Sequence, residues 1–272
     1  MSLSISILVD NHSTRADLTP TAGFSAYVCD ADTRLLFDTG TDDRVIDHAQ
    51  RMGIDLATLD AIVLSHGHHD HTGGLPALID WFGRRGLRPP LIAHPDAFLR
   101  RHVRDHPWSN ERRLGPPLAA TAIEAGFEVR PTATPLAMSD RFCFLGEIPA
   151  TADRATLGVV CRPEGDQADA IRDDSALVWS GRDGLVILSG CSHSGITAMI
   201  DHARAVTGCE RVSDVVGGLH LQTAGPAHVW RLRQSLQRRG SPTLYACHCT
   251  GWARDWLPRQ HDIGCGAVLH FV

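Results

Sequence analysis

The chain has 272 residues, 43% of them hydrophobic, and a formal net charge of −5, so that it can build a large core. All 26 of its basic residues are arginine. The lack of lysine excludes a Schiff-base lysine, a pyridoxal-phosphate linkage and a phosphate-loop lysine. The charge balance, without any block of like charge, argues against general affinity for nucleic acids or membranes. Sixteen histidines point instead to acid–base or metal chemistry.

The predicted elements begin as a strand meander and continue as alternating strands and helices. Apolar runs bounded by turn residues predict strands at 3–9, 24–29, 34–38, 61–65, 91–94, 127–130, 141–145, 157–161, 176–180, 185–189, 214–217, 243–247 and 267–271. Helical patterns lie at 43–52, 75–83, 95–104, 117–125, 195–207 and 225–238. This order predicts an α/β (α+β) protein in which helices cover the faces of sheets.

Two segments look less like core. Residues 100–117 are rich in arginine and end in Pro-Pro, and residues 150–173 are rich in Ala, Asp and Gly. We expect both to be surface insertions in a single domain spanning 1–272. Such loops serve as lids or binding loops, or are simply tolerated insertions.

The first residues and the cysteines bear on the compartment. The segment MSLSISILVDN has no basic stretch, long apolar run or small-residue cleavage site. No stretch approaches 18 apolar residues. We therefore expect a cytoplasmic protein, in which the eight cysteines are core thiols, ligands or catalysts.

One stretch carries the chemistry. The predicted buried strand ending at Ser65 leads into His66, His68, Asp70 and His71. Residues two apart in an extended segment point the same way, so His66 and His68 can reach one ion together. Asp70 and His71 follow on the turn and could serve a second ion. Imidazoles with a carboxylate suit zinc, and also iron or manganese.

The HxHxDH pattern between a buried strand and a helix resembles the metallo-β-lactamase superfamily, an αββα sandwich with a dinuclear metal site. The preceding LLFDTG, residues 35–40, matches that superfamily's early strand, whose aspartate, here Asp38, supports the site. Further matching motifs lie at Ser65–Gly74, Gly146–Pro149, Asp173–Ala176, Gly190–Gly195, Gly217–Leu221 and His248–Gly251. Together they are similar to the metal-dependent hydrolase group labelled 7,8-dihydropterin-6-yl-methyl-4-(β-D-ribofuranosyl)aminobenzene-5′-phosphate synthase-like.

The chain departs from that group in two places. Thr21 and Ala22 stand where a Glu-His pair is usual, and His69 stands where Tyr is common. Both positions could face the substrate, which would make the pocket chemistry differ from the labelled reaction.

The resemblance implies two divalent metal ions, taken as zinc with iron or manganese as alternatives. The implied ligands are His66, His68 and His193 for one ion, and Asp70, His71 and His248 for the other. Cys191 lies at the strand end that supplies a bridging aspartate, or in some β-lactamases a cysteine, so it is either a ligand or a wall residue.

Other candidates around the site keep two interpretations each. Glu147 replaces the usual third-motif histidine and is a ligand, a substrate contact or a structural carboxylate. His220, after two glycines, is an acid–base group at the mouth or a more distant support. Cys247 and Cys249 could bind zinc but flank His248 as wall residues; His94, after a strand, is predicted to cap or pack.

The predicted function is a metal-dependent hydrolase of a small anionic molecule, using metal-bound hydroxide to attack a carbonyl or phosphoryl centre. Asp70 or a nearby histidine would orient the nucleophile or return a proton. Arginine must hold any anionic group, since lysine is absent. The densest supply of arginine comprises Arg100, Arg101, Arg104, Arg112 and Arg113, which could equally form a solvated basic face.

Three alternatives remain on the same fold. A nuclease or phosphodiesterase shares the HxHxDH motif, but the net charge and the 6% aromatic content weigh against it. An iron-dependent redox enzyme of the diiron branch usually has Glu where His68 stands. The last is a non-catalytic metal- or ligand-binding protein.

Overall fold

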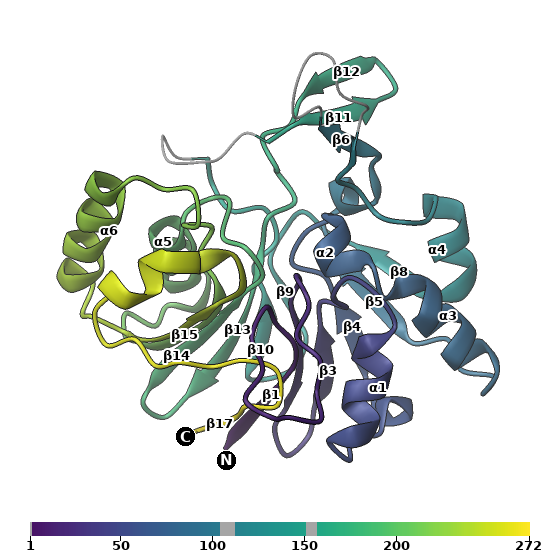
Figure 1. Ribbon diagram of the computed structural model, residues 1–272, viewed down its shortest axis with the longest axis horizontal. Coiled ribbons are helices and arrows are strands. Elements are labelled where there is room, and N and C mark those ends of the chain that lie inside the picture. Colours follow the sequence, from purple (N-terminus) through teal and green to yellow (C-terminus); the bar gives the residue numbers. More distant parts are fainter. Residues whose placement is uncertain (1, 104–111, 151–156) are drawn as a thin grey trace.

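Two sheets packed face to face, with helices on both outer sides, form the centre of the structure (Figure 1). The computed structural model describes residues 2–103, 112–150 and 157–272. Helices α1 (Arg44–Arg51), α3 (Leu75–Gly83) and α4 (Ala120–Gly126) lie outside the first sheet. Helices α5 (Ile196–Thr207) and α6 (Pro226–Arg238) lie outside the second. The predicted αββα sandwich is confirmed.

The first sheet changes from antiparallel to parallel along its width. In sheet order its strands are β17 (Val268–Phe271), β1 (Leu3–Val9), β2 (Ser25–Cys29), β3 (Arg34–Phe37), β4 (Ala61–Val63), β5 (Pro90–Ala93) and β8 (Glu128–Pro131). β1, β2 and β3 form the predicted antiparallel meander, whereas β3, β4, β5 and β8 run parallel. Parallel neighbours need a crossover, which places α1, α3 and α4 on one face.

The second sheet repeats this plan. Its strands, in sheet order, are β16 (Thr243–Cys247), β15 (Val212–Gly218), β14 (Gly184–Ser189), β13 (Ala176–Gly181), β10 (Phe142–Phe144) and β9 (Leu136–Ala137). β14, β15 and β16 are parallel and are joined through α5 and α6. A 3-10 helix, η3 (His248–Trp256), follows β16, and a shorter one, η1 (Leu56–Thr58), precedes β4.

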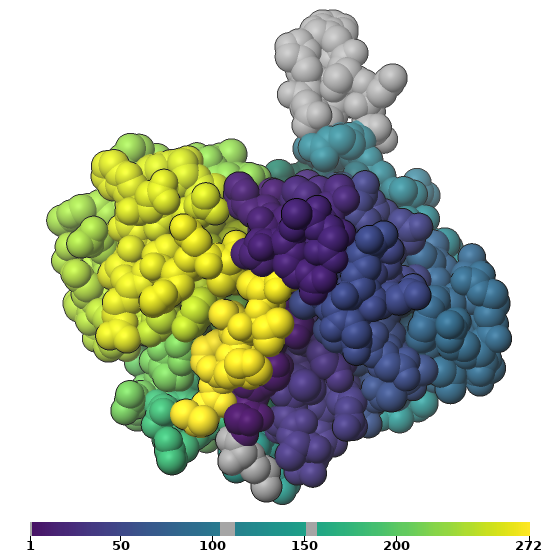
Figure 2. Space-filling view, turned by 60° about the horizontal axis from the view of Figure 1, so that its bottom comes forward, coloured from purple at the N-terminus to yellow at the C-terminus, as the bar shows by residue number. Residues whose placement is uncertain are grey.

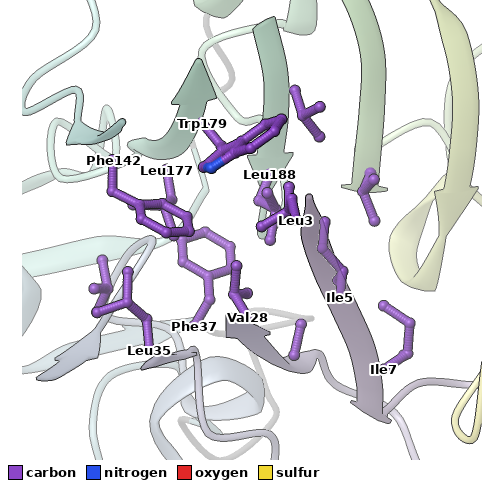
Figure 3. Packing of buried hydrophobic residues seen from close by; sticks show 14 of the residues in the cluster. Leu3, Ile5, Ile7, Val28, Leu35, Phe37, Phe142, Leu177, Trp179 and Leu188 are labelled. Atoms are coloured by element: carbon purple, nitrogen blue, oxygen red, sulfur yellow. The ribbon is translucent and has the colours of Figure 1, made fainter. Parts of the chain in front are cut away.

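The main core lies between the two sheets (Figure 3). Alternate residues of β1, such as Leu3 and Ile5, point into it beside Phe37 and Trp179, all at most 1% exposed. The opposite face of the first sheet packs against helices α1, α3 and α4. Leu8 points to that side and belongs to a second hydrophobic cluster. Strands buried on both faces read as nearly continuous apolar runs, which is why the sequence predicts them well.

A small third sheet joins the two segments that were predicted as separate insertions. It consists of β12 (Gly165–Ala168), β11 (Val159–Arg162), β6 (Arg101–Val103) and β7 (Arg112–Arg113). In Figure 1 it stands above the two main sheets. Residues 104–111 and 151–156, which include Arg104, lie outside the described residues.

The helix predicted over 95–104 is wrong for the described residues. Only Pro95–Phe98 forms a 3-10 turn, η2, after which Arg101 begins strand β6. Arg101 is only 2% exposed, and its guanidinium pairs with Asp169 at 2.6 Å and with Asp173 at 2.5 Å. These buried ion pairs override the helical pattern. A buried double ion pair that spans some 70 positions of sequence leaves no local signal.

The carboxyl ends of β3, β4, β14, β15 and β16 meet at one edge of the sandwich, where the predicted motifs follow them. Ligands characteristically bind at this edge of parallel sheets. The N-terminal residues, in purple, lie against the C-terminal residues, in yellow, on the molecular surface (Figure 2). Among the described residues no helix combines the length and apolar character needed to cross a bilayer.

Candidate metal centre

The loop after β4 turns sharply into a short helix, α2 (His69–Thr72). His68 precedes this helix in an extended conformation, and its carbonyl accepts the hydroxyl hydrogen bond of Thr72 at 2.9 Å. The extended segment holds His66 and His68 with their ring centroids 4.6 Å apart. Helix α2 then places Asp70 and His71 beside these two histidines.

A first group of three imidazoles comes together from two sheets. One ligand-capable atom from each of His66, His68 and His193 lies within 4.8 Å of the others, and all three residues are at most 4% exposed. His193 follows β14 in the second sheet, as predicted. The Nε2 atoms of His66 and His68, and both ring nitrogens of His193, have no hydrogen-bond partner among the described residues.

A second group lies beside the first. Ligand atoms of Asp70, His71 and His248 also lie within 4.8 Å of one another. Asp70 Oδ2 is 3.8 Å from His71 Nε2 and 3.4 Å from His248 Nε2. Both of these buried Nε2 atoms again lack a hydrogen-bond partner in the described part of the chain. The ring of His71 is 4.2 Å from that of His66, centroid to centroid, so the two groups are neighbours.

Asp38 orients both groups of ligand atoms through hydrogen bonds to Ser65 and His71. Its Oδ1 accepts the backbone N–H of Ser65 at 2.7 Å, and its Oδ2 accepts the Ser65 hydroxyl at 2.7 Å and His71 Nδ1 at 2.8 Å. Asp38 is fully buried and has a left-handed backbone, with φ +56°. A carboxylate on Nδ1 fixes the tautomer that turns the Nε2 lone pair toward the centre.

Two residues that the sequence reasoning missed hold His248. Its backbone N–H donates to Asp10 Oδ2 at 2.9 Å, and its Nδ1 lies 2.9 Å from Asn11 Oδ1. Both residues directly follow β1, so they stand near the edge where the other motifs meet. Polar residues after a buried strand were the available signal.

The histidines of the two groups differ in the direction of their pKa shifts. Burial lowers the pKa of His66 and His193 well below the usual value and that of His68 to about 3. Burial would also lower the pKa of His71 and His248. For His71, Asp70 and Asp38 outweigh burial and raise the pKa. For His248, Cys249 and Asp70 outweigh it and raise the pKa to about 9. Burial would raise the pKa of Asp70, yet the two histidines hold it well below its usual range.

Cys191 lies between the groups. Its sulfur shares one set of close ligand atoms with His66 and His71, and another with His248 and Cys249. Its thiol lies 3.1 Å from the Cys249 sulfur, to which it donates. Burial raises the pKa of Cys191 well above that of a free thiol. Cys191 therefore stands where the resemblance places it.

His220 forms the wall beside His193, with ring centroids 4.2 Å apart. Its backbone has φ +49°, an uncommon conformation for a residue other than glycine. The preceding Gly217 and Gly218 allow close approach, since a Cβ on them would lie 1.9 Å from the Ser189 oxygen and 2.3 Å from the Gly190 oxygen, respectively. The role of His220 in acid–base chemistry stays a prediction.

The small third sheet is tied to the histidine loop. Asp173 Oδ2 accepts the backbone N–H of Gly67, between His66 and His68, at 2.7 Å, while Asp173 Oδ1 pairs with Arg101. Arg101, predicted as part of a supply for anionic substrate, is buried and pairs through Nε and Nη2 with Asp169 and Asp173, while its Nη1 has no hydrogen-bond partner among the described residues. Arg112 and Arg113 are exposed on β7.

Glu147 and His94 lie together near the third sheet. Glu147 accepts two hydrogen bonds from Arg172, at 3.1 and 3.0 Å, and its Oε2 is 3.6 Å from His94 Nε2. His94 Nδ1 accepts the N–H of Asp96 at 3.1 Å, which confirms the predicted capping role. The contact of Glu147 with a metal or substrate stays a prediction.

The side chains present fit divalent metal ions. Buried imidazole nitrogens without partners are costly unless something accepts them. Here such nitrogens from five histidines converge, three in the first group and two in the second, where the Asp70 carboxylate joins them. The Nδ1 atoms of His66, His71 and His248 are already in contact with Ser65, Asp38 and Asn11. Nitrogen and oxygen donors of this kind suit zinc, iron or manganese.

Comparison with known proteins agrees with this geometry. Residues 18–146 match the family model described as the metallo-beta-lactamase superfamily. The chain is 28% identical over 229 residues to a 7,8-dihydropterin-6-methyl-4-(beta-D-ribofuranosyl)-aminobenzene-5'-phosphate synthase of Methanocaldococcus jannaschii, covering 82% of this chain and 77% of that protein.

Solved structures show the same arrangement. A metal-dependent hydrolase of the beta-lactamase superfamily superposes with a TM-score of 0.82 at 27% identity, over 98% of both chains. A metallo-beta-lactamase fold protein of Bacillus subtilis shares the fold, with a TM-score of 0.59 at 14% identity over 99% of both chains. The family-model match over residues 18–146, the curated relative and the solved hydrolase together show that the chain has the metallo-β-lactamase fold and is similar to members of that superfamily.

Proposed function

We propose that the protein is a hydrolase that uses two divalent metal ions, zinc in the first instance, to cleave a small anionic molecule. One observation carries the proposal: two adjoining groups of buried ligand atoms whose nitrogens have no hydrogen-bond partner among the described residues. His66, His68 and His193 would hold one ion, and Asp70, His71 and His248 the other. The similarity to a solved metal-dependent hydrolase, over 98% of both chains, supports this choice.

The ions would supply Lewis acidity toward a water molecule and toward the substrate's carbonyl or phosphoryl oxygen. The chain's own residues then act on protons and positions. Asp70, within 3.8 Å of His71 and 3.4 Å of His248, can accept a proton from the attacking water through its second oxygen. His220, whose buried Nδ1 has no partner in the described residues, stands at the wall where a leaving group would take up a proton.

Hydrolysis is favoured over a synthase reaction, although one relative is named a synthase. The chain contains no lysine, so that no lysine amine can form a covalent intermediate. Burial raises the pKa of the Cys191 thiol. The Cys249 sulfur accepts the hydrogen bond of Cys191. The centre therefore offers no lysine amine, and water bound by the ions is the nucleophile that we propose.

The test begins with metal content. The purified full chain, stripped and reloaded separately with zinc, manganese and iron, is assayed for metal stoichiometry and by anomalous scattering from crystals. Each form is then offered carboxylic esters, lactones, thioesters, phosphomonoesters and phosphodiesters. Two ions at the six named residues, with turnover of at least one class, support the proposal. A protein that binds two ions yet hydrolyses none of the classes contradicts it, and oxygen consumption by the iron form would indicate the redox alternative.

A further inference from the structure

A cavity of about 570 Å³ lies between α5 and α6, which stand outside the second sheet (Figure 1). His193 and His220 form part of its wall, so it opens directly beside the candidate metal centre. Its volume falls in the range of pockets that bury a small molecule. The reacting bond and the rest of a substrate can therefore occupy adjoining spaces.

The described residues that line this cavity carry only positive or neutral groups. They include no aspartate or glutamate but two arginines, Arg231 and Arg238, in a chain whose net charge is −5. The two arginines are seven residues apart on α6 and share a helix face with Leu232 and Ser235. Neither guanidinium has an ion-pair partner within the part of the chain that the structure describes.

The Ser192 hydroxyl is a second polar group at the wall of this cavity. The hydroxyl of Ser192, a residue 3% exposed, has no hydrogen-bond partner among the described residues. Beside it α5 begins at Ile196, with no side-chain cap on its first turn. The backbone N–H groups and dipole at such a helix start favour negative charge. Ser192 and Ile196 both line the cavity.

Apolar side chains lie between these polar groups. Ile196, Leu219, Leu221 and Leu232 contribute to the lining. An aromatic or aliphatic segment of a ligand would bury apolar area against these side chains, whereas a fully polar ligand would leave that area without an apolar partner. The cavity thus matches a molecule with an apolar middle and a negative end.

We propose that this cavity binds the non-reacting part of the substrate, with Arg231 and Arg238 holding a phosphate or carboxylate at its far end. The Ser192 hydroxyl donates to an acceptor atom closer to His193. The substrate class is therefore a small amphipathic anion whose scissile bond lies beside His193 and His220. This assignment rests on the proposed hydrolase function and specifies its substrate.

The test uses phenylphosphonate, which has an aromatic ring and a dianion but no hydrolysable ester, together with benzoate and the neutral benzyl alcohol. Binding to the full chain is measured by calorimetry, with metal loaded and with metal removed. The variant is Arg231→Gln/Arg238→Gln. The matched control is Arg233→Gln, an exposed arginine of the same helix that does not line the cavity.

We expect phenylphosphonate or benzoate to bind with and without metal. The double variant should weaken this binding by at least about tenfold, because charge-assisted hydrogen bonds are lost. The control should change it less than about twofold, and the benzyl alcohol affinity should not depend on either change. The tighter of the two anions identifies phosphate or carboxylate as the preferred end group.

Two results separate failure of this inference from failure of the proposed function. Anion binding that disappears on metal removal but is unchanged in the double variant would overturn the inference, since the anion would then sit on the ions. Anion binding that depends on both arginines, in a protein that hydrolyses none of the offered classes, would support the anion site while contradicting the hydrolase. Thermal unfolding of each variant verifies that it is folded.

Discussion

Asp38 Oδ2 accepts the Nδ1 hydrogen of His71 at 2.8 Å, while the same carboxylate receives both the N–H and the hydroxyl of Ser65. Replacing it by asparagine, Asp38→Asn, keeps the shape but places an amide donor among groups that donate. We expect the metal affinity to fall about 10- to 100-fold, because His71 loses its fixed tautomer. Competition with a chromogenic chelator measures this, with exposed Asp32→Asn as the control. Equal affinities for the variant and the native protein would contradict the role of Asp38.

His68→Ala removes a buried imidazole from the first group of ligand atoms. We expect the bound metal to fall from two ions to one or fewer and hydrolysis to be abolished, because only two imidazoles remain there. Metal analysis after gel filtration gives the stoichiometry. The control is His270→Ala, an exposed histidine on β17, which should keep both ions. Near-native metal content in His68→Ala would rule out our ligand assignment.

Cys191→Ser asks whether the strand-end sulfur is a ligand. Because the Cys191 thiol donates to Cys249, we expect it to stay protonated and the variant to bind both ions within about threefold of the native affinity. Cobalt substitution gives a direct readout, since a thiolate ligand produces an intense charge-transfer absorption. We expect the cobalt spectra of the native protein and Cys191→Ser to be alike. A thiolate band that the variant loses would make Cys191 a ligand.

Arg101→Gln leaves Asp169 and Asp173 buried without their guanidinium. Breaking one side of a buried ion pair costs about 3–5 kcal/mol, which corresponds to a fall in Tm of roughly 10 °C for a chain of this size. Since Asp173 also holds Gly67 in the histidine loop, we expect weaker metal binding as well. Thermal unfolding with and without metal tests both effects. Arg100→Gln, the exposed neighbour, should leave Tm within about 1 °C.

The ion pair between Asp96 and Arg162, 2.5 Å long, links η2 to β11 and gives a pH dependence. Burial opposes ionisation of Asp96, but the hydrogen-bonded Arg162 outweighs it and lowers the pKa of the carboxyl. The folded pKa lies below the unfolded one, so the pair stabilises the fold at neutral pH and this contribution is lost as pH falls below about 4. Arg162→Gln should lower Tm by a few degrees at pH 7, about 1 kcal/mol, with the difference narrowing toward pH 3.

The control for that pair is Arg182→Gln, whose exposed contact with Asp183 contributes little. Its Tm should follow the native protein at each pH. A constant difference between Arg162→Gln and the native protein from pH 7 to pH 3 would contradict the assigned titration, since the cause would then be packing of the arginine stem.

The sequence by itself determined the sandwich and most of the candidate ligands. Strands such as β1 and β14 are buried on both faces, so that their apolar runs are visible without a structure. His66, His68, Asp70 and His71 fall within the six positions 66–71, shortly after β4, and local backbone geometry is enough to bring them together. His193 and His248 followed from their place at strand ends in motifs that resemble the superfamily.

Only the tertiary structure decided what supports and surrounds the centre. Asn11 reaches His248 across 237 positions, and Arg101 reaches Asp173 across 72, and no periodicity records such pairs. The arginines proposed to bind an anion also differ from those that the sequence predicted. The sequence favoured residues 100–113, where arginine is most frequent, whereas the cavity beside His193 is lined by Arg231 and Arg238 of α6. Buried polar partners and cavity walls depend on how distant elements pack, which the hydrophobic pattern does not encode.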